Sequence, residues 1–257
     1  MSPIVLITGA TSGIGEATAR RFAAEGWRVI INGRRRDRLD ALKRELQGLH
    51  GTLEGGQVHA LRFDVRDNAE VERAFSGLPA DWRAIDLLVN NGGLAAGLDP
   101  IQTGQLADWD QMIDTNLKGL LHVSRAVIPG MIERGRGHII NIGSVAGKEV
   151  YPRGNVYCAT KHAVDALTKA MRQDLLPHGI KVTQIAPGLA ETEFSLVRFK
   201  GDERLASVPY QGMEPLRGAD IANLIWFAAT LPPHMCINDL VVTPTAQANS
   251  TLVCRST

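Results

Sequence analysis

Close to its start the chain reads Ile4-Val5-Leu6-Ile7-Thr8-Gly9-Ala10-Thr11-Ser12-Gly13-Ile14-Gly15. The pattern predicts a buried strand over Ile4 to Thr8 and a helix from Ile14 to Glu25. Glycines at such a strand-to-helix turn let a pyrophosphate approach free backbone N–H groups and the positive end of the helix dipole. The spacing Gly-x3-Gly-x-Gly departs from GxGxxG, and three glycines after a strand also occur in simple tight turns. The turn therefore predicts a dinucleotide site, with a plain turn as the alternative.

Short β-branched runs and longer segments of helical period alternate along the chain. Seven runs are predicted strands: Ile4 to Thr8, Arg28 to Asn32, Val58 to Arg62, Asp86 to Asn90, His138 to Ile142, Lys181 to Ala186 and Leu240 to Thr243. Helices are predicted over Ile14 to Glu25, Arg38 to Leu46, Asn68 to Ser76, Leu106 to Arg134, Val156 to Leu176 and Ala219 to Leu231. This order predicts an α/β fold with one doubly wound, Rossmann-type, seven-stranded parallel sheet and helices on both faces.

The chain shows no internal repeat and no linker that would divide it, so we expect one catalytic, nucleotide-binding domain over residues 1–245. Residues 188–217 lack a clear period. We expect them to form a lid or substrate loop inside that domain, with plain disorder as the alternative. The polar tail, residues 246–257, follows the last strand and is expected either to be disordered or to cross to a partner subunit.

The overall charge is nearly balanced, with 28 Lys plus Arg against 27 Asp plus Glu and a formal net charge of +1. We therefore expect neither nucleic acid nor a membrane as a partner. The sequence has no run of 18 apolar residues, and Met1-Ser2-Pro3 leads directly into the first predicted strand, so we expect neither a transmembrane helix nor a cleaved leader. Cys158, Cys236 and Cys254 include no CxxC pair, which favours reduced thiols in a cytoplasmic protein. No clustered ligand set indicates a metal.

The end of the second predicted strand discriminates between dinucleotides, because an acidic group there would bind the ribose 2′-hydroxyl of NAD. The sequence there is Ile31-Asn32-Gly33-Arg34-Arg35-Arg36, which has no carboxylate. Guanidinium groups suit a 2′-phosphate, so Arg34 and Arg35 predict NADP(H). A solvated helix start is the alternative for this run. Asp64, followed by Val65, is expected near the adenine edge, unless Asp64 caps the helix that begins near Asn68.

Tyr157 and Lys161 are four residues apart on a predicted helix, a spacing that puts both side chains on one face. A positive charge at about 4 Å would lower the Tyr pKa by roughly three units from about 10, which would make the phenol a usable acid and base. An isolated YxxxK also occurs by chance on helix surfaces. Here it accompanies the glycine turn, Asn90-Asn91-Gly92-Gly93 after the fourth strand, and Ser144 after the fifth.

Together these motifs make the sequence similar to the short-chain dehydrogenase/reductase family over essentially its whole length. The resemblance implies that Tyr157 exchanges a proton with the substrate and that Lys161 binds the nicotinamide ribose and lowers the Tyr pKa. It implies that Ser144 hydrogen-bonds the substrate carbonyl and that Asn116 holds a relay water. Gly92 departs from the family, which usually has Ala there, and the missing methyl is expected to loosen packing near the adenine side.

The cofactor site implied by the turn, the arginines and the resemblance combines several segments. Its expected residues are Gly9, Thr11, Ser12, Gly13, Ile14, Gly15, Arg34, Arg35, Asp64, Val65, Asn91, Tyr157, Lys161, Pro187, Gly188 and Thr192. Pro187, Gly188 and Thr192 resemble the family segment that flanks the nicotinamide carboxamide. The implied reaction moves a hydride between nicotinamide and a carbonyl carbon.

The segment after Pro187 resembles the corresponding loop of NADP-dependent 3-hydroxy acid dehydrogenases, which oxidise serine, allo-threonine or 3-hydroxyisobutyrate, or reduce malonic semialdehyde. A small anionic substrate in a closed pocket needs a cation. Arg198 is the first candidate, beside Ser144 and Tyr157 as substrate-binding residues, with Arg153 and Lys200 as second choices. An Arg on a solvated loop face is the alternative.

Three other functions remain open at this stage. A sulfonate would fit the same cation, so sulfoacetaldehyde reduction is an alternative. A generic ketone or 3-oxoacyl reductase of the same family would need an apolar or carrier-linked substrate. A non-enzymatic NADP(H) sensor or scaffold could share the fold. The resemblance also implies a homotetramer, although the apolar helix faces would suit ordinary core burial equally well.

Overall fold

The computed structural model describes residues 2–49 and 57–256, and the predicted fold class is confirmed. Seven parallel strands form one sheet in the order β3-β2-β1-β4-β5-β6-β9. Their bounds are β1 (Ile4–Ile7), β2 (Arg28–Gly33), β3 (Val58–Arg62), β4 (Leu87–Asn90), β5 (Gly137–Ile142), β6 (Ile180–Pro187) and β9 (Asp239–Val242). In register, Leu6 of β1 lies between Ile30 and Leu88. Every residue of β1, β2 and β4 is buried, as expected for strands covered on both faces.

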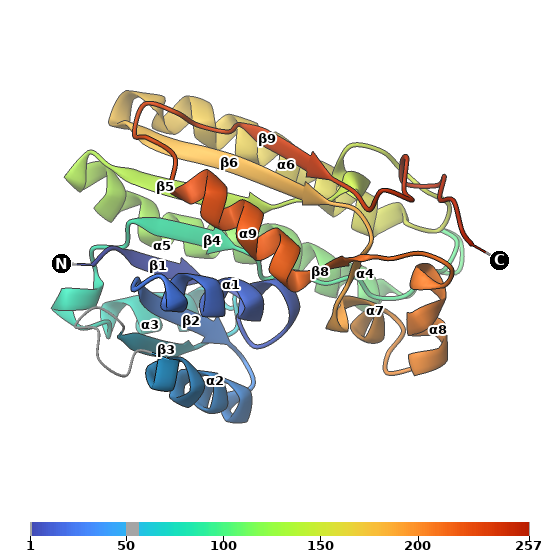
Figure 1. Cartoon of the computed structure of the whole chain (residues 1–257), viewed down its shortest axis with the longest axis horizontal. Coiled ribbons are helices and arrows are strands. Elements are labelled where there is room, and N and C mark those ends of the chain that lie inside the picture. The colour runs from blue at the N-terminus through green and yellow to red at the C-terminus, as the bar shows by residue number, and fades with distance from the viewer. Residues whose placement is uncertain (1, 50–56, 257) are drawn as a thin grey trace.

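Helices cover both faces of this sheet (Figure 1). One face carries α1 (Gly13–Ala24), α2 (Arg36–Leu49) and α9 (Gly218–Ala229), and the other carries α3 (Asn68–Ser76), α5 (Gly119–Arg134) and α6 (Asn155–Leu175). Each face has its own hydrophobic core. Phe22, Leu39 and Ile225 pack with Val5 and Ile7 on the first face. Val123, Met131 and Val164 pack with Ile4 and Leu6 on the second. The alternation of side chains along β1 thus supplies both cores.

The chain reverses its direction of travel across the sheet between β1 and β4. From β1 it moves outward through β2 to β3, and it then returns to place β4 on the other side of β1. The carboxyl ends of β1 and β4 therefore border a crevice, where ligands bind in open parallel α/β sheets. Residues that follow these strands are placed at this edge by the topology alone.

The predicted helix over Leu106 to Arg134 is one helical rod with a local change of pitch. It consists of α4 (Leu106–Ile113), a π-helical turn over Asp114–Lys118, and α5. Short 3₁₀ turns also occur at Ala80–Trp82, Val145–Gly147, Leu176–His178 and Val208–Tyr210. No helix in the described part of the chain is long and apolar enough to cross a membrane.

Residues 188–217 are ordered as a small subdomain, which we call the lid, at the carboxyl edge of the sheet (Figure 1). The lid contains β7 (Ala190–Glu191), α7 (Glu193–Arg198), α8 (Glu203–Ser207) and β8 (Leu216–Arg217), and β7 pairs with β8 in parallel. The tail then returns to this region. Gln247 bridges Val253, and the amide of Ser256 donates to the Gly212 carbonyl at 2.8 Å.

Candidate active site

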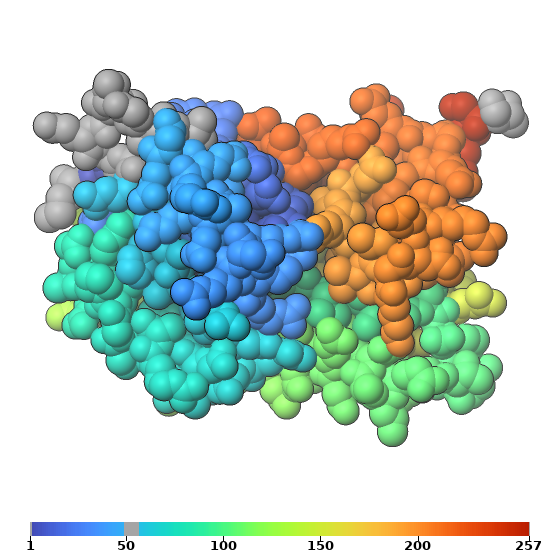
Figure 2. Space-filling view, turned by 90° about the horizontal axis from the view of Figure 1, so that it is seen from below, coloured from blue at the N-terminus to red at the C-terminus, as the bar shows by residue number. Residues whose placement is uncertain are grey.

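A cavity of about 560 Å³ lies at the carboxyl edge of the sheet, between the β1 and β2 ends on one side and the lid on the other. Figure 2 shows the blue surface of the early segments facing the orange surface of the lid. The predicted residues that line it are Gly9, Thr11, Ser12, Gly13, Ile14, Arg34, Arg35, Asp64, Val65, Asn91, Ser144, Tyr157, Lys161, Pro187, Gly188, Thr192 and Arg198. Gly15 and Asn116 are buried and support this wall. The fold thus gathers segments from most of the chain around one space.

The glycine turn is shaped to admit an anion. The first intrahelical bond of α1 runs from the Glu16 amide to the Ser12 carbonyl at 3.2 Å, so the amides before Glu16 precede the helical ladder. Gly13 has φ of +55°, and a Cβ there would lie 3.0 Å from Thr192 Cβ. A Cβ on Gly15 would lie 2.4 Å from the Gly9 carbonyl oxygen. Close approach and helix polarity fit a dinucleotide pyrophosphate at this turn.

The two arginines after β2 occupy different environments. The Arg34 side chain is 54% exposed and lies 3.7 Å from Asp64 Oδ2, which leaves most of its donors available. Arg35 donates to Thr11 Oγ1 at 3.1 Å and to Glu193 Oε2 at 3.0 Å. Guanidinium groups at this end of β2 fit a 2′-phosphate. Both side chains border the cavity.

Asp64 lies at the edge of the same cavity, as expected, and accepts hydrogen bonds from Arg66. It does not cap α3, so that alternative is wrong. The N-cap is Asp67, whose carboxylate accepts from the Glu70 amide at 3.0 Å. Asp64 is therefore free of a helix-capping role and faces the region where an adenine ring would lie.

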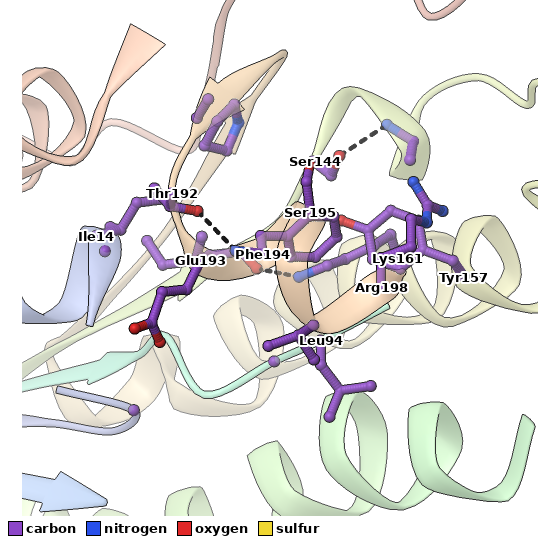
Figure 3. Close-up of a pocket in the computed structure, with 18 of the residues that line it drawn as sticks. Ile14, Leu94, Ser144, Tyr157, Lys161, Thr192, Glu193, Phe194, Ser195 and Arg198 are labelled. Atoms are coloured by element: carbon purple, nitrogen blue, oxygen red, sulfur yellow. Dashed lines mark hydrogen bonds between the residues drawn. The ribbon is translucent and has the colours of Figure 1, made fainter. Parts of the chain in front are cut away.

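Ser144, Tyr157 and Lys161 converge from two elements (Figure 3). Ser144 follows β5, and its Oγ accepts from the Ala146 amide at 3.1 Å. Tyr157 and Lys161 lie one turn apart on α6. Lys161 Nζ donates to the Ile142 carbonyl at 2.8 Å, which ties the ammonium to the end of β5. One hydroxyl, one phenol and one ammonium thus face a common space.

Burial dominates the acid–base properties of this group. It raises the pKa of Tyr157, the neighbouring Tyr151 raises it further, and a hydrogen bond with Ser144 and the charge of Arg198 oppose the rise. Burial also lowers the pKa of Lys161 to about 8. The YxxxK spacing predicts a Tyr157 pKa lowered by Lys161, and this prediction is wrong for the structure. Burial is the largest cause of the raised pKa of Tyr157.

Arg198 lies on α7, directly over Tyr157. Its guanidinium carbon lies 5.2 Å from the centroid of the Tyr157 ring, and its Nη2 donates to Tyr151 Oη at 2.5 Å. The Phe194 ring meets Tyr157 edge to face at 5.4 Å. Arg153 and Lys200, the second-choice cations, do not line this cavity. Arg153 is exposed and Lys200 pairs with Asp108.

Tyr151 and Phe194 were not assigned roles from the sequence, although they form the walls around Arg198. The only sequence signal for these two residues is that aromatic side chains are scarce, at 5% of the chain. Two of these few rings flank the predicted tyrosine. Their convergence depends on the lid and could not be derived from spacing.

Comparisons with known proteins agree with this geometry. A sequence profile of the short chain dehydrogenases matches residues 3–202. The chain belongs to the short chain dehydrogenase family. It is 50% identical over 246 residues to the NADP-dependent 3-hydroxy acid dehydrogenase YdfG of Salmonella typhi, which covers 95% of this chain and 96% of the relative. It is 49% identical over 249 residues to Sulfoacetaldehyde reductase 2 of Chromohalobacter salexigens, with 96% of each chain covered.

Among solved structures, the closed form of serine dehydrogenase complexed with NADP+ matches with a TM-score of 0.91 and 46% identity. The match covers 99% of this chain and 100% of that chain. The chain is therefore an oxidoreductase of the short chain dehydrogenase family, as the motifs predict.

Asn116 is buried and supports the wall of the cavity. It lies on the π-helical turn, is 2% exposed, and its amide exchanges two hydrogen bonds of 2.8 Å with the Leu94 backbone. A Cβ on Gly93 would lie 3.2 Å from Asn116 Oδ1 and 3.7 Å from Lys161 Nζ. The wider π turn and the small residue bring Asn116 and Lys161 close. A relay-water role for Asn116 stays a prediction.

Gly92, where this chain departs from the family pattern, is tightly packed. A Cβ there would lie 3.2 Å from Thr8 Oγ1, which accepts from the Gly92 amide at 2.8 Å. Asn91 Nδ2 donates to the Thr8 carbonyl at 2.9 Å. The expected loosening is wrong, because the β1 and β4 ends close over the missing methyl.

Among residues 2–49 and 57–256, no group of three or more His, Cys, Asp or Glu is arranged to hold a metal ion.

Proposed function

We propose that the chain is an NADP(H)-dependent oxidoreductase that acts on small 3-hydroxy acids. It would transfer a hydride between nicotinamide and the carbon that bears the 3-hydroxyl or 3-oxo group. Serine, allo-threonine and 3-hydroxyisobutyrate are the candidate alcohols, and malonic semialdehyde is the candidate for reduction. The observation that carries the proposal is the guanidinium of Arg198 above the Tyr157 ring, in a cavity that the lid borders.

The cofactor part of the proposal rests on the cationic end of β2 and on the glycine turn. Arg34 and Arg35 border the cavity without a carboxylate at the strand end. Relatives and a neighbouring structure whose names include NADP support the same choice. When bound, the cofactor supplies or accepts the hydride. Thr192 and Gly188 of the lid would flank its nicotinamide end.

Tyr157 would handle the proton of the reaction. Burial raises its pKa, so the phenol keeps its proton at neutral pH and can donate it to a carbonyl oxygen during reduction. Ser144 would hydrogen-bond the same oxygen. Lys161 donates one bond to the Ile142 carbonyl and lines the cavity, so its other N–H groups would be left for a ribose hydroxyl. In the oxidative direction the proton returns to the Tyr157 oxygen.

Arg198 would bind the substrate carboxylate. A guanidinium forms charge-assisted, two-pronged bonds to such a group. Arg198 lines the cavity, and within the described residues its guanidinium donates only one hydrogen bond, from Nη2 to Tyr151 Oη, so Nη1 is left for a substrate anion. With the anion held there, the other end of a three-carbon acid would face Ser144 and Tyr157. Tyr151 and Phe194 exclude water around that position.

Sulfoacetaldehyde reduction is the second candidate, because a sulfonate, like a carboxylate, offers Arg198 two anionic oxygens for a two-pronged contact, and one relative carries that name. A generic ketone or 3-oxoacyl reductase is disfavoured by the guanidinium over Tyr157, which an apolar substrate would leave without an anionic partner. A sensor or scaffold role is disfavoured because Ser144, Tyr157 and Lys161 all face the cavity.

The test follows NADPH and NADH at 340 nm with purified protein. Its panel contains 3-hydroxy acids, malonic semialdehyde, sulfoacetaldehyde and uncharged alcohols and ketones. Turnover of a 3-hydroxy acid with NADP(H) is expected. Turnover restricted to sulfoacetaldehyde would favour the second candidate. Turnover of uncharged ketones alone, or no turnover at all, would contradict both.

Arg198→Ala tests the anion clamp directly. Loss of charge-assisted bonds should lower kcat/KM for serine by roughly 10- to 100-fold and leave an uncharged alcohol nearly unaffected. Arg204→Ala is the matched control, because Arg204 is an exposed guanidinium of the same lid. Equal losses on both substrates would remove the assigned role of Arg198.

We also propose a homotetramer in the cytoplasm. Exposed apolar side chains on α9 and β9 support association, as Phe227 is 54% and Val241 53% exposed. All three cysteines of the sequence are free thiols, which suits a reducing compartment. Light scattering and cell fractionation test these two points.

A further inference from the structure

Two contacts attach the ends of helix α7 of the lid to the body of the domain. At one end, the Gly97 amide donates to the Arg198 carbonyl at 3.0 Å, and Lys200 Nζ lies 2.9 Å from Asp108 Oδ2. The other end carries a single acidic residue, Glu193, at the start of α7. Its carboxylate reaches across the cavity opening to the helix that follows β2. This second attachment is not needed for the proposed chemistry and has no part in it.

Two guanidinium groups hold the Glu193 carboxylate. Arg35 Nη1 donates to Oε2 at 3.0 Å, and Arg38 Nη1 donates to Oε1. Arg35 also bonds Thr11 of the glycine turn, at 3.1 Å to Oγ1. Although partial burial opposes ionisation, the bonds from Arg38 and Arg35 lower the pKa of Glu193, which keeps it a carboxylate at neutral pH. A continuous polar connection thus runs from the glycine turn to the lid.

We infer that Glu193 is a positioning residue that straps helix α7 to Arg35 and Arg38 and thereby holds the substrate-binding side chains of the lid over Tyr157. The inference rests on the proposed function, because it assigns Phe194 and Arg198 to the substrate pocket. Glu193 itself touches neither the reacting atoms nor Tyr157. In Figure 3 its carboxylate points away from Tyr157, whereas Phe194, the next residue, lies beside it.

The short length of α7 makes this strap effective. The helix has six residues, so its first residue, Glu193, and its last, Arg198, belong to one compact unit. Thr192 caps the helix by accepting from the Phe194 amide at 3.2 Å, and the Phe199 amide closes it on the Ser195 carbonyl at 3.0 Å. Movement at Glu193 is therefore transmitted to the aromatic ring and the guanidinium. The Gly97 attachment acts at the far end of the helix, on the Arg198 carbonyl.

The strap is compatible with a 2′-phosphate at the same cluster. Arg34, Arg35 and Arg38 carry three positive charges, and Glu193 carries one negative charge. A 2′-phosphate would add about −1.5 to −2, which brings the cluster close to neutrality without displacing the carboxylate. Arg34 is not bonded to Glu193 and keeps its donors for the phosphate. The cofactor and the lid would thus share one cationic cluster.

The expected size of the effect is moderate. The side chains of Glu193, Arg35 and Arg38 are 33%, 41% and 44% exposed, so solvent and salt screen the pairs. Two such pairs on one carboxylate should change the substrate KM by about five- to ten-fold. The change should shrink at high salt, because screening already weakens the wild-type strap.

Glu193→Gln tests the strap with saturating NADPH and the substrate that the panel identifies. We expect a KM about five- to ten-fold higher, kcat within about two-fold, and a Kd for NADPH within about two-fold of wild type. Arg38→Gln should raise KM in the same direction, and the double variant should be no worse than Glu193→Gln alone. Arg36→Gln is the control, because Arg36 begins the same helix and pairs only within it, with Asp40.

Limited trypsin digestion gives a readout that needs no substrate. Arg198, Lys200 and Arg204 are trypsin sites in the lid, and Glu193→Gln should be cleaved there faster than the wild type or Arg36→Gln. Unchanged KM and unchanged cleavage, additive effects of Glu193 and Arg38, or an equal effect of Arg36→Gln would overturn the strap. So would an unchanged KM with much tighter NADPH binding. If the wild type turned over nothing in the panel, the proposed function would fail, and cleavage would still decide the strap.

Discussion

Tyr157 is held by groups that pull its pKa in opposite directions. Burial and Tyr151 raise it, and the hydrogen bond with Ser144 and the charge of Arg198 lower it. Lys161 donates one hydrogen bond to the Ile142 carbonyl, and burial lowers the pKa of Lys161 to about 8. In the proposed reaction this phenol would act as the proton donor, from a site buried beside polar groups. Small changes among its neighbours should therefore alter proton transfer more than cofactor binding.

Tyr157→Phe removes one oxygen and leaves the ring contacts with Phe194 and Arg198 in place. We expect kcat to fall by about 1,000-fold, because a positioned acid contributes roughly 10²- to 10⁴-fold to such a step. NADPH binding, measured by fluorescence titration, should stay within about two-fold of wild type. Ser144→Ala is the companion variant and should lose less than Tyr157→Phe. Retention of more than about a tenth of turnover by Tyr157→Phe would contradict the assigned role.

His138 on β5 is a second buried titratable residue, distant from the reaction. Burial lowers its pKa from 6.5 to about 3, with a smaller contribution from Lys181, and its Nε2 bonds Thr183 Oγ1 at 2.8 Å. Between these two pKa values the unfolded chain binds a proton and the folded chain does not. The stability contribution is therefore complete above about pH 6.5 and is lost as the pH falls toward 3, by an amount on the order of a few kcal/mol.

His138→Gln should flatten this dependence, because Gln does not titrate and can still bond Thr183. The measurement is the free energy of unfolding by urea between pH 4.5 and 7.5. His178→Gln is the control, since His178 is exposed at a 3₁₀ turn. An equally steep loss of stability at low pH in the His138 variant would show that other groups carry the acid sensitivity.

The site depends on two segments, the lid and the returning tail, whose sequences have no clear helical or strand periodicity. The lid supplies α7, and the returning tail supplies Gln247, which is 5% exposed. Gln247 Oε1 accepts from the Leu189 amide at 2.8 Å, and its Nε2 donates to the Asn249 carbonyl at 3.1 Å. A tail of polar residues is thus ordered by satisfying backbone groups that the lid leaves open.

Gln247→Ala should leave the amide of Leu189, a half-buried residue, without its acceptor. We expect a loss of about 1–3 kcal/mol in unfolding free energy and a higher substrate KM, because Leu189 begins the lid. Differential scanning calorimetry and steady-state kinetics measure the two effects. Gln211→Ala, an exposed glutamine of the same lid, should change neither. A Gln247 variant with the wild-type Tm would mean that the tail does not hold the lid.

In the molecule as a whole, two hydrophobic cores enclose the sheet, and the residues that line the cavity gather at its carboxyl edge (Figure 1). The molecular surface carries exposed apolar side chains on α9 and β9. Phe227 on α9 and Val241 on β9 are more than half exposed, at 54% and 53%. Apolar side chains that the fold leaves uncovered on adjacent elements fit association between copies of the chain.

Phe227→Asp should disrupt that association. Burying a carboxylate in an apolar interface costs free energy. We therefore expect the proposed tetramer to dissociate into a smaller oligomer or a monomer, with little change in the stability of the monomer. Size-exclusion chromatography with light scattering measures the mass. Leu176→Asp is the control, since Leu176 is 74% exposed on a different surface turn. A wild-type protein that elutes as a monomer would contradict the proposed tetramer.

Periodicity and short spacings in the sequence predict the seven strands, their parallel arrangement, the glycine turn and the Tyr157–Lys161 pair, because local sterics and burial decide these features. The packing of the lid against the sheet is what shows that Arg198, and neither Arg153 nor Lys200, faces Tyr157, and that burial is the largest influence on the Tyr157 pKa. It also brought Glu193 to Arg35 across 158 residues of sequence. Such contacts are set by how distant segments pack, and no local pattern encodes them.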